Sequence, residues 1–506
     1  MLWMLACNGE VVDEPVVPEI HALVDDTWTT LQRRWAPVVP SEATYASIDA
    51  EEVTVFDWTE YRDYGLGVVE EEGSTWTELA DLAPDFEEGA DRRSVGLIWQ
   101  SADPQVIDEE SPIRLSAWAD LYRPQGHLSV FAWEAHVRTA QRISEISGGF
   151  DFALVAGDLT DGGQKNELSW VLTALEGGVI DPDSGADDAT SFNHPFESEG
   201  LDTEWYAAVG NHDVLYNGGF DKVTEEIREA AAGEEVYEFL TFPNGFRDGS
   251  SEGAEVLTEG PTPADPDRIP LTLSEFLVEL ADAGHVETQT GYFAVQASEA
   301  VKLIVLNTVD DQPEGLGKGS AGWMDETQLA WLAEELDTDA LVLVMSHHRA
   351  KDFDDDSPVS GDELVEVLDS PSLVLHVTGH GHSNTKGLRG AENGYWELML
   401  ASTLDFPIQS RVIELVDEQN GYLSIYCTNL EDLSATDSPA HHSRELAAGK
   451  LAFPAFAQTV DIDSAWASDV ANQNLLLRVP LTVEQQARLE DLDGREVVST
   501  TVLAEL

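Results

Sequence analysis

Five short apolar runs in this chain each lead into a motif made of residues that bind metal ions. The runs have the length and composition of buried strands and are residues 94–100, 152–156, 205–209, 340–345 and 373–378. The motifs after them are Asp103-Pro104-Gln105, Gly157-Asp158-Leu159-Thr160-Asp161, Gly210-Asn211-His212-Asp213, Ser346-His347-His348 and Gly379-His380-Gly381-His382. In open α/β sheets, ligands bind beyond the carboxyl ends of strands, where loops converge on one edge. The pattern therefore predicts an α/β fold with a metal site at that edge.

The segments between the motifs support the same fold class. Residues 130–146 and 325–336 have helical patterns, and residues 301–306 form a further apolar run. Strands that alternate with helices indicate an α/β protein. The long polar stretches 181–200 and 217–285 are expected to be surface insertions that shape a substrate pocket.

The charge of the chain restricts the partners that it can bind. The sequence contains 97 Asp+Glu and 26 Lys+Arg, which gives a formal net charge of -71. Such a surface repels nucleic acid and anionic lipid, so no nucleic-acid binding is expected. A phosphate substrate would also be repelled unless bound cations reversed the local field.

The chain opens with a short apolar run, Met1 to Ala6, followed by Cys7. This resembles the end of a bacterial lipoprotein signal, although it lacks a basic segment and is shorter than such signals. We therefore expect export and lipid anchoring to the cell envelope through Cys7, with a cytoplasmic location as the alternative. The predicted organisation is a leader and acidic tether (1–25), a packed extension (26–92), a domain carrying the motifs (93–430) and a C-terminal extension (431–506).

In order and type, the motifs resemble those of the calcineurin-like metallophosphoesterases: D-x-H, G-D-x-x-D, G-N-H-[DE], H and G-H-x-H. The resemblance covers residues 93–430 and implies two mixed β-sheets flanked by helices (α/β/β/α) around two Mn, Fe, Zn or Ni ions. Gln105 departs from the family, which usually has His there, and an amide oxygen is a weaker ligand. The stretch from Asp103 to Arg114 is similar to an uncharacterised bacterial subfamily with D-P-Q in the first motif.

The resemblance also implies roles for single residues. One metal would be held by Asp103, Gln105, Asp158 and His382, and the other by Asp158, Asn211, His347 and His380. Asp158 is the expected bridge, because cations about 3.5–4 Å apart need a shared anionic ligand. His212 is expected to aid the leaving group, with Asp213 accepting its other ring N–H. Further candidates for supporting the ligands or contacting the substrate are His348, Arg114, Asp161 and His194.

The implied activity is hydrolysis of a small-molecule phosphate mono- or diester by a metal-bridging hydroxide. Two alternatives remain open at this point. The same site suits a nucleotide-type pyrophosphohydrolase, and a chain with a lost ligand set would be a lipid-anchored, non-catalytic binding or scaffold protein. Gln105 is the one feature that hints at such a loss.

Overall fold

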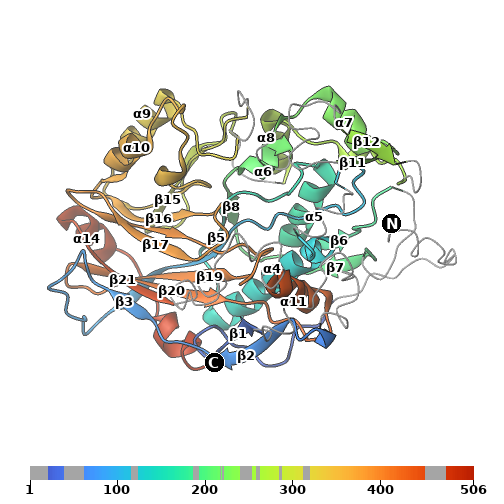
Figure 1. Cartoon of the computed structure of the whole chain (residues 1–506). Helices are drawn as coiled ribbons and strands as arrows, with labels where there is room; N and C mark the ends of the chain where they lie inside the picture. Colours follow the sequence, from blue (N-terminus) through green and yellow to red (C-terminus); the bar gives the residue numbers. More distant parts are fainter. Residues whose placement is uncertain are drawn as a thin grey trace.

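The computed structural model shows two β-sheets packed face to face, with helices on the outside of each (Figure 1). The residues that it describes are 21–38, 62–114, 123–185, 193–216, 218, 221–239, 254–257, 262–283, 288–311, 319–450 and 474–506. The expected lipidation site, Cys7, lies outside them, as do parts of both predicted insertions. Among the described residues, no helix combines the length and apolar content needed to cross a bilayer.

The first sheet has seven strands in the order β3-β21-β20-β19-β4-β5-β8. These are β3 (Thr77–Leu79), β21 (Leu475–Pro480), β20 (Tyr422–Leu430), β19 (Ser410–Asp417), β4 (Arg93–Ser101), β5 (Phe152–Val155) and β8 (Trp205–Ala207). Strands β4, β5 and β8 are mutually parallel, so their carboxyl ends lie at one edge. On the other side β19 and β20 are antiparallel, and β21 and β3 extend the sheet with segments from near the two ends of the chain.

The second sheet has six strands in the order β13-β14-β15-β16-β18-β17. These are β13 (Phe293–Gln296), β14 (Val301–Val305), β15 (Leu341–Met345), β16 (Leu373–Thr378), β18 (Tyr395–Met399) and β17 (Thr385–Arg389). The four central strands, β14, β15, β16 and β18, are parallel, and the two outer strands are antiparallel to them. Every apolar run that precedes a motif, and the run 301–306, is therefore a strand of one of the two sheets.

Alternating side chains divide the core into three layers, as the two-residue period of a strand requires. Ile98 of β4 and Leu343 of β15 belong to the core between the sheets. Trp99 packs outward against α4 and α5, whereas Val344 packs outward against α9 and α10. These helices are α4 (Ser129–Ser147), α5 (Lys165–Glu176), α9 (Glu326–Glu335) and α10 (Gly361–Leu368). The predicted architecture of two mixed sheets flanked by helices is confirmed (Figure 1).

The remaining described elements are short and lie outside the two sheets. They include the strand pairs β1–β2 (Arg33–Pro37, Val68–Glu72), β6–β7 (Gly178–Ile180, Phe196–Ser198), β9–β10 (Leu215–Tyr216, Asp221–Lys222) and β11–β12 (Val236–Phe239, Ala254–Leu257). The helices are α6 (Asn211–Val214), α7 (Glu225–Ala232), α8 (Leu273–Asp282), α11 (Pro439–Lys450) and α14 (Val483–Glu490). The predicted helix 325–336 is α9, and its N-cap Asp325 accepts a hydrogen bond from the Gln328 N–H (2.7 Å).

A buried ion pair ties the described part of insertion 217–285 to the loop that follows β4. Arg268 and Asp108 are both fully buried, and Arg268 Nε lies 3.1 Å from Asp108 Oδ2. The same guanidinium donates to the carbonyl oxygens of Pro263 (2.6 Å) and Ser184 (2.8 Å). Asp108 closely follows the first candidate motif, so the insertion braces the loop that carries it.

We expect Arg268→Ala to lower the free energy of unfolding by about 3–5 kcal/mol, because it leaves Asp108 buried without its cation. Arg488→Ala, which removes an exposed arginine of α14, should change it by less than about 0.5 kcal/mol. Denaturant unfolding of both variants would measure the difference. Equal stabilities of the two variants would contradict the bracing role.

Candidate metal centre

The two sheets bring the motif residues together at adjoining edges. Asp103, Asp158 and Asn211 follow the neighbouring parallel strands β4, β5 and β8 of the first sheet. His347 and His380 follow the neighbouring parallel strands β15 and β16 of the second sheet. Two groups have ligand atoms within 4.8 Å of one another: Asp103, Asp158 and His347, and His347, His348 and His380. All five motifs thus contribute to one region, as the strand-end rule predicts.

The loops at this edge adopt a strained backbone. Positive φ angles occur at Asp103 (49°), Gln105 (39°), Asp158 (52°), His380 (73°) and His382 (48°). Each such angle in a non-glycine residue costs about 1–3 kcal/mol, and residues of this kind cluster at functional sites. Position 157 requires glycine, because its φ is +85° and an added Cβ would lie 2.7 Å from His347 Nδ1.

The tautomer of His347 follows from its surroundings. Its Nδ1 lies 2.8 Å from the Ala156 carbonyl oxygen, which can only accept, so Nδ1 carries the proton. Nε2 then faces Asn211 Oδ1 at 3.1 Å and Asp158 Oδ2 at 3.1 Å. Asp103 Oδ1 approaches the same nitrogen at 4.0 Å. In a neutral ring all of these atoms are acceptors, so a proton or a metal cation must lie among them.

Two amide side chains complete the oxygen donors. Asn211 Nδ2 donates to the Gly218 carbonyl oxygen, which turns Oδ1 toward His347. Gln105 is buried, with Nε2 3.1 Å from Asp158 Oδ2, and its Oε1 has no hydrogen-bond partner in the described part of the chain. Rotating the Gln105 amide by half a turn would place Oε1 beside Asp158 as a second oxygen donor. The donor set fits a divalent transition metal better than it fits an empty pocket.

His382 is oriented by a carboxylate that the sequence analysis missed. His382 Nδ1 lies 2.6 Å from Asp405 Oδ2, and its Nε2 lies 3.4 Å from Asp103 Oδ1. Lys450 Nζ in turn lies 2.6 Å from Asp405 Oδ1. A carboxylate on the remote ring nitrogen fixes the tautomer of a metal-binding histidine and increases its basicity. Asp405 lies in the loop after β18, so the strand-end rule could have indicated it.

Two buried imidazoles carry protons when the centre contains no cation. Burial opposes the charge on His347, but the Asp158 and Asp103 carboxylates raise its pKa to about 9. Burial likewise opposes charge on His382, and Asp103 and Asp405 raise its pKa to about 9. Although burial disfavours its charge, the pKa of Asp158 is held well below the usual range by His347 and His212. The centre is a cluster of buried carboxylates and imidazoles that takes up either protons or metal cations.

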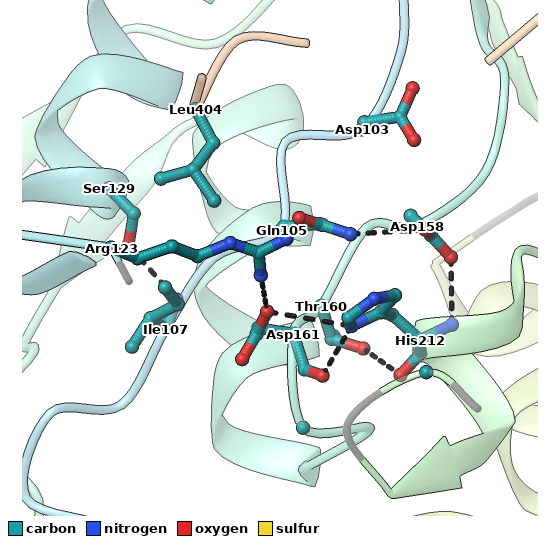
Figure 2. Close-up of polar contacts among 12 residues, drawn as sticks. Asp103, Gln105, Ile107, Arg123, Ser129, Asp158, Thr160, Asp161, His212 and Leu404 are labelled. Carbon is teal, nitrogen blue, oxygen red and sulfur yellow. Dashed lines mark hydrogen bonds and ion pairs between the residues drawn. The ribbon is translucent and has the colours of Figure 1, made fainter. Parts of the chain in front are cut away.

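His212 lies beside the ligands rather than among them. Its backbone N–H donates to Asp158 Oδ1 (2.8 Å), and its ring Nδ1 lies 2.8 Å from the Asp161 carbonyl oxygen (Figure 2). Its side chain is 16% exposed, so a substrate can reach the ring. Gly218 packs on this ring, because a Cβ there would clash with His212 Cδ2 and Nε2.

The expected role of Asp213 needs correction. Its carboxylate accepts from the backbone N–H groups of Gly210 (2.8 Å) and Thr160 (3.0 Å), whereas the His212 ring is bonded to Asp161. The short helix α6 turns Asp213 back to its own first turn, where an unpaired N–H requires an acceptor. Asp213 therefore holds two motif loops together and does not orient the His212 ring.

Two arginines pair with Asp161, the residue that contacts the His212 ring. Arg114 and Arg123 both form ion pairs with the buried Asp161 carboxylate; Figure 2 shows the Arg123 contact. No sequence pattern marked Arg123, whereas Arg114 and Asp161 were among the candidates. The pKa of Asp161 is lowered, because Arg114, Arg123 and His212 outweigh the effect of burial.

His194, a further candidate, packs in an aromatic cluster. Its ring centroid lies 5.7 Å from that of Phe131 in α4 and 5.6 Å from that of His21. Phe196 packs on the same Phe131 ring at 4.7 Å. These ring contacts place His194 beside α4 in the outer core.

Comparisons with known proteins yield only remote structural similarities. No family model matches the sequence, and no curated protein matches it. A dimetal phosphatase from Danio rerio is 12% identical and aligns over 67% of this chain and 99% of its own, with a TM-score of 0.35. A purple acid phosphatase from yellow lupin (Lupinus luteus) seeds is 9% identical over 72% of this chain and 56% of its own, with a TM-score of 0.35. PhoD is 10% identical over 76% of this chain and 79% of its own, with a TM-score of 0.32. At these values the similarity carries no argument about function, which therefore rests on the centre itself.

We expect Asp405→Asn to weaken metal binding about 10–100-fold, because His382 loses the carboxylate that orients it. Asp437→Asn, which neutralises an exposed carboxylate near the start of α11, is the matched control and should leave affinity unchanged. Calorimetric titration of metal-stripped protein would measure both affinities. Equal affinities of the two variants would show that Asp405 does not support a ligand.

Metal affinity should rise with pH. Below about pH 9 both His347 and His382 carry a proton in the metal-free protein, and a metal ion must displace it. Each displaced proton adds about tenfold in affinity per pH unit, so the slope between about pH 6 and 8 should approach two. Calorimetry in buffers of different ionisation enthalpy would count the released protons. Affinity that is constant over this range would contradict the assignment of these two ligands.

Proposed function

We propose that this protein is a metal-dependent phosphoesterase, related to the calcineurin-like metallophosphoesterases, that hydrolyses a phosphate mono- or diester at a dinuclear centre. The observation that best supports the proposal is the buried convergence of acceptors on His347 Nε2, 3.1 Å from Asn211 Oδ1 and 3.1 Å from Asp158 Oδ2. An accessible imidazole, His212, lies next to this cluster. Paired cations with an adjacent proton donor are suited to phosphoester hydrolysis.

The residues present fit two metal ions. Asp103, Gln105, Asp158 and His382 would hold one ion, and Asp158, Asn211, His347 and His380 would hold the other. When bound, the ions supply a deprotonated water and neutralise the phosphoryl oxygens. Imidazole and oxygen donors together suit Mn, Fe, Zn or Ni. The overall charge of -71 makes such local cations necessary for an anionic substrate.

The protein's own contribution to the reaction is positioning and proton transfer. As the water oxygen bonds to phosphorus and the ester P–O bond breaks, the leaving oxygen takes up a proton. His212 is suited to donate it from Nε2 when the ring carries both protons, because the Asp161 carbonyl oxygen accepts the Nδ1–H (2.8 Å). Asp158 connects the two parts of the centre, since it contacts Gln105, His347 and the His212 backbone.

A pyrophosphohydrolase acting on a nucleotide-type diphosphate is the second candidate. The Arg114 and Arg123 guanidiniums pair with Asp161, whose backbone carbonyl oxygen contacts the His212 ring. An anionic leaving group gains from nearby guanidinium groups and requires less protonation than an alcohol.

Export through Cys7 also remains a proposal, and fractionation of cells that express Cys7→Ser beside the natural sequence would test it.

A substrate and metal screen tests the main proposal. Full-length protein loaded with Mn should contain about two metal ions per chain, as expected for a two-metal site, and should hydrolyse phosphate monoesters or diesters. Preference for a nucleoside diphosphate over both simple esters would select the second candidate. Protein that stays inactive with Mn, Fe, Zn and Ni would contradict both and favour a binding role.

Two variants should separate metal binding from proton transfer. Asp158→Asn should lose activity and metal content together, because it removes the shared ligand. His212→Ala should keep both ions and lose about 10²–10⁴-fold in kcat, with a smaller loss on substrates that have good leaving groups. His194→Ala serves as an imidazole control outside the centre. A His212→Ala loss that is equal for all leaving groups would argue against a general acid.

A further inference from the structure

Three imidazoles face one another at the second-sheet side of the centre. His347 and His348 follow β15, and His380 follows β16. The ring centroid of His348 lies 4.4 Å from that of His380 and 4.7 Å from that of His347. One nitrogen from each ring lies within 4.8 Å of the other two. The sequence motifs had assigned only the first and last of these rings to a metal.

Thr308 holds His348 in place at one ring nitrogen, and the other ring nitrogen has no hydrogen-bond partner among the described residues. Its side chain is fully buried, and Thr308 Oγ1 lies 3.0 Å from its Nδ1 and accepts its backbone N–H at 3.1 Å. Thr308 follows β14, so a third parallel strand of the sheet positions the ring. His348 Nε2 is buried and has no hydrogen-bond partner among the residues that the structure describes. An unmatched buried nitrogen costs about 1–3 kcal/mol, so a ligand on Nε2 would stabilise the site.

A metal ion fits this nitrogen better than a phosphate oxygen does. Nitrogen ligands at about 2.0–2.1 Å from one ion lie about 3–3.5 Å apart. Three imidazole nitrogens within 4.8 Å of one another, on the buried His347 and His348 and the half-buried His380, need only a small closure. A diffusing substrate, in contrast, must reach an atom whose ring has no exposed surface. His212, whose side chain is 16% exposed, is accessible to a substrate, whereas His348 is fully buried.

We propose that His348 is a third imidazole ligand, and that the centre is chemically asymmetric. One metal position is nitrogen-rich, with His347, His348 and His380. The other is oxygen-rich, with Asp103 and Gln105 beside a single imidazole, His382. Imidazole-rich sites select Zn, Fe or Ni, whereas carboxylate and carbonyl oxygens suit Mn. The inference rests on the metal centre of the proposed function, but not on hydrolysis.

The test measures metal binding by full-length, metal-stripped protein. After exposure to one equivalent of Zn with excess Mn and removal of unbound metal, elemental analysis should find about one ion of each per chain, because the nitrogen-rich position takes the Zn. His348→Asn should weaken Zn binding at least about tenfold, since even changes behind metal ligands cost about 10–100-fold. Mn binding should stay unchanged. The visible spectrum of the Co-substituted variant should also differ from that of the natural protein, because one nitrogen ligand is lost.

Two further variants make the result decisive. His376→Asn removes another fully buried imidazole, on β16, whose Nε2 is bonded to Ser346 Oγ (2.8 Å), and it should leave Zn affinity unchanged. Thr308→Val removes the hydroxyl that orients His348 and should weaken Zn binding less than His348→Asn does. Thermal melting checks that each variant is folded. If His348→Asn does not fold, Thr308→Val decides the question through the same Zn and Co measurements.

Several outcomes would overturn the inference. One is a His348→Asn variant whose Zn affinity and Co spectrum are unchanged; if that variant does not fold, the same result in Thr308→Val counts. Another is a loss of Zn affinity in His348→Asn that is no larger than the loss in His376→Asn. A raised KM with intact metal binding would assign Nε2 to the substrate instead. Asymmetric metal binding without any phosphoesterase activity would leave the inference standing and refute the proposed function.

Discussion

The centre depends on one hydrogen bond that joins the two sheets. His347, at the end of β15, donates its Nδ1–H to the carbonyl oxygen of Ala156, at the end of β5 (2.8 Å). This bond fixes the relative position of the two strand edges and also forces Nε2 toward the carboxylates. Close approach is possible because Gly157 has no side chain to meet the ring. The same contact therefore links the two edges and sets the direction of a candidate metal ligand.

Electrostatics explains how such a centre persists in a strongly acidic protein. With only 26 Lys+Arg against 97 Asp+Glu, basic side chains are scarce, yet three of them stand behind the centre. Arg114 and Arg123 neutralise Asp161, which orients His212, and Lys450 neutralises Asp405, which orients His382. Buried carboxylates require paired charges. The scarce cations thus pair with the carboxylates beside His212 and His382, and the candidate ligands Asp103 and Asp158 have no basic Lys or Arg partner among the described ion pairs.

Much of the fold and of the centre followed from local patterns. Strands β4, β5, β8, β15 and β16 were predicted because apolar runs of their length must be buried, and helices α4 and α9 because their patterns have helical periods. The convergence of the five motifs followed from the rule that ligands gather at carboxyl strand ends. Other contacts depend on residues far apart in the chain. Arg123 and the pairing of β21 with β20 carried no local signal strong enough to be singled out, and Asp405 follows β18, a strand that the sequence analysis did not predict.

The sequence by itself determined which residue types stand at the strand ends, because a short motif directly after a buried strand must lie in the loop at the carboxyl end of that strand. Only the tertiary structure decided what each of them contacts. In the tertiary structure the His212 ring contacts Asp161 rather than Asp213, because helix α6 turns Asp213 back onto its own first turn. It also buried His348 against Thr308, whose strand, β14, precedes β15 in the sheet. Hydrogen bonds between distant loops depend on the packing of two sheets, and no local pattern encodes that packing.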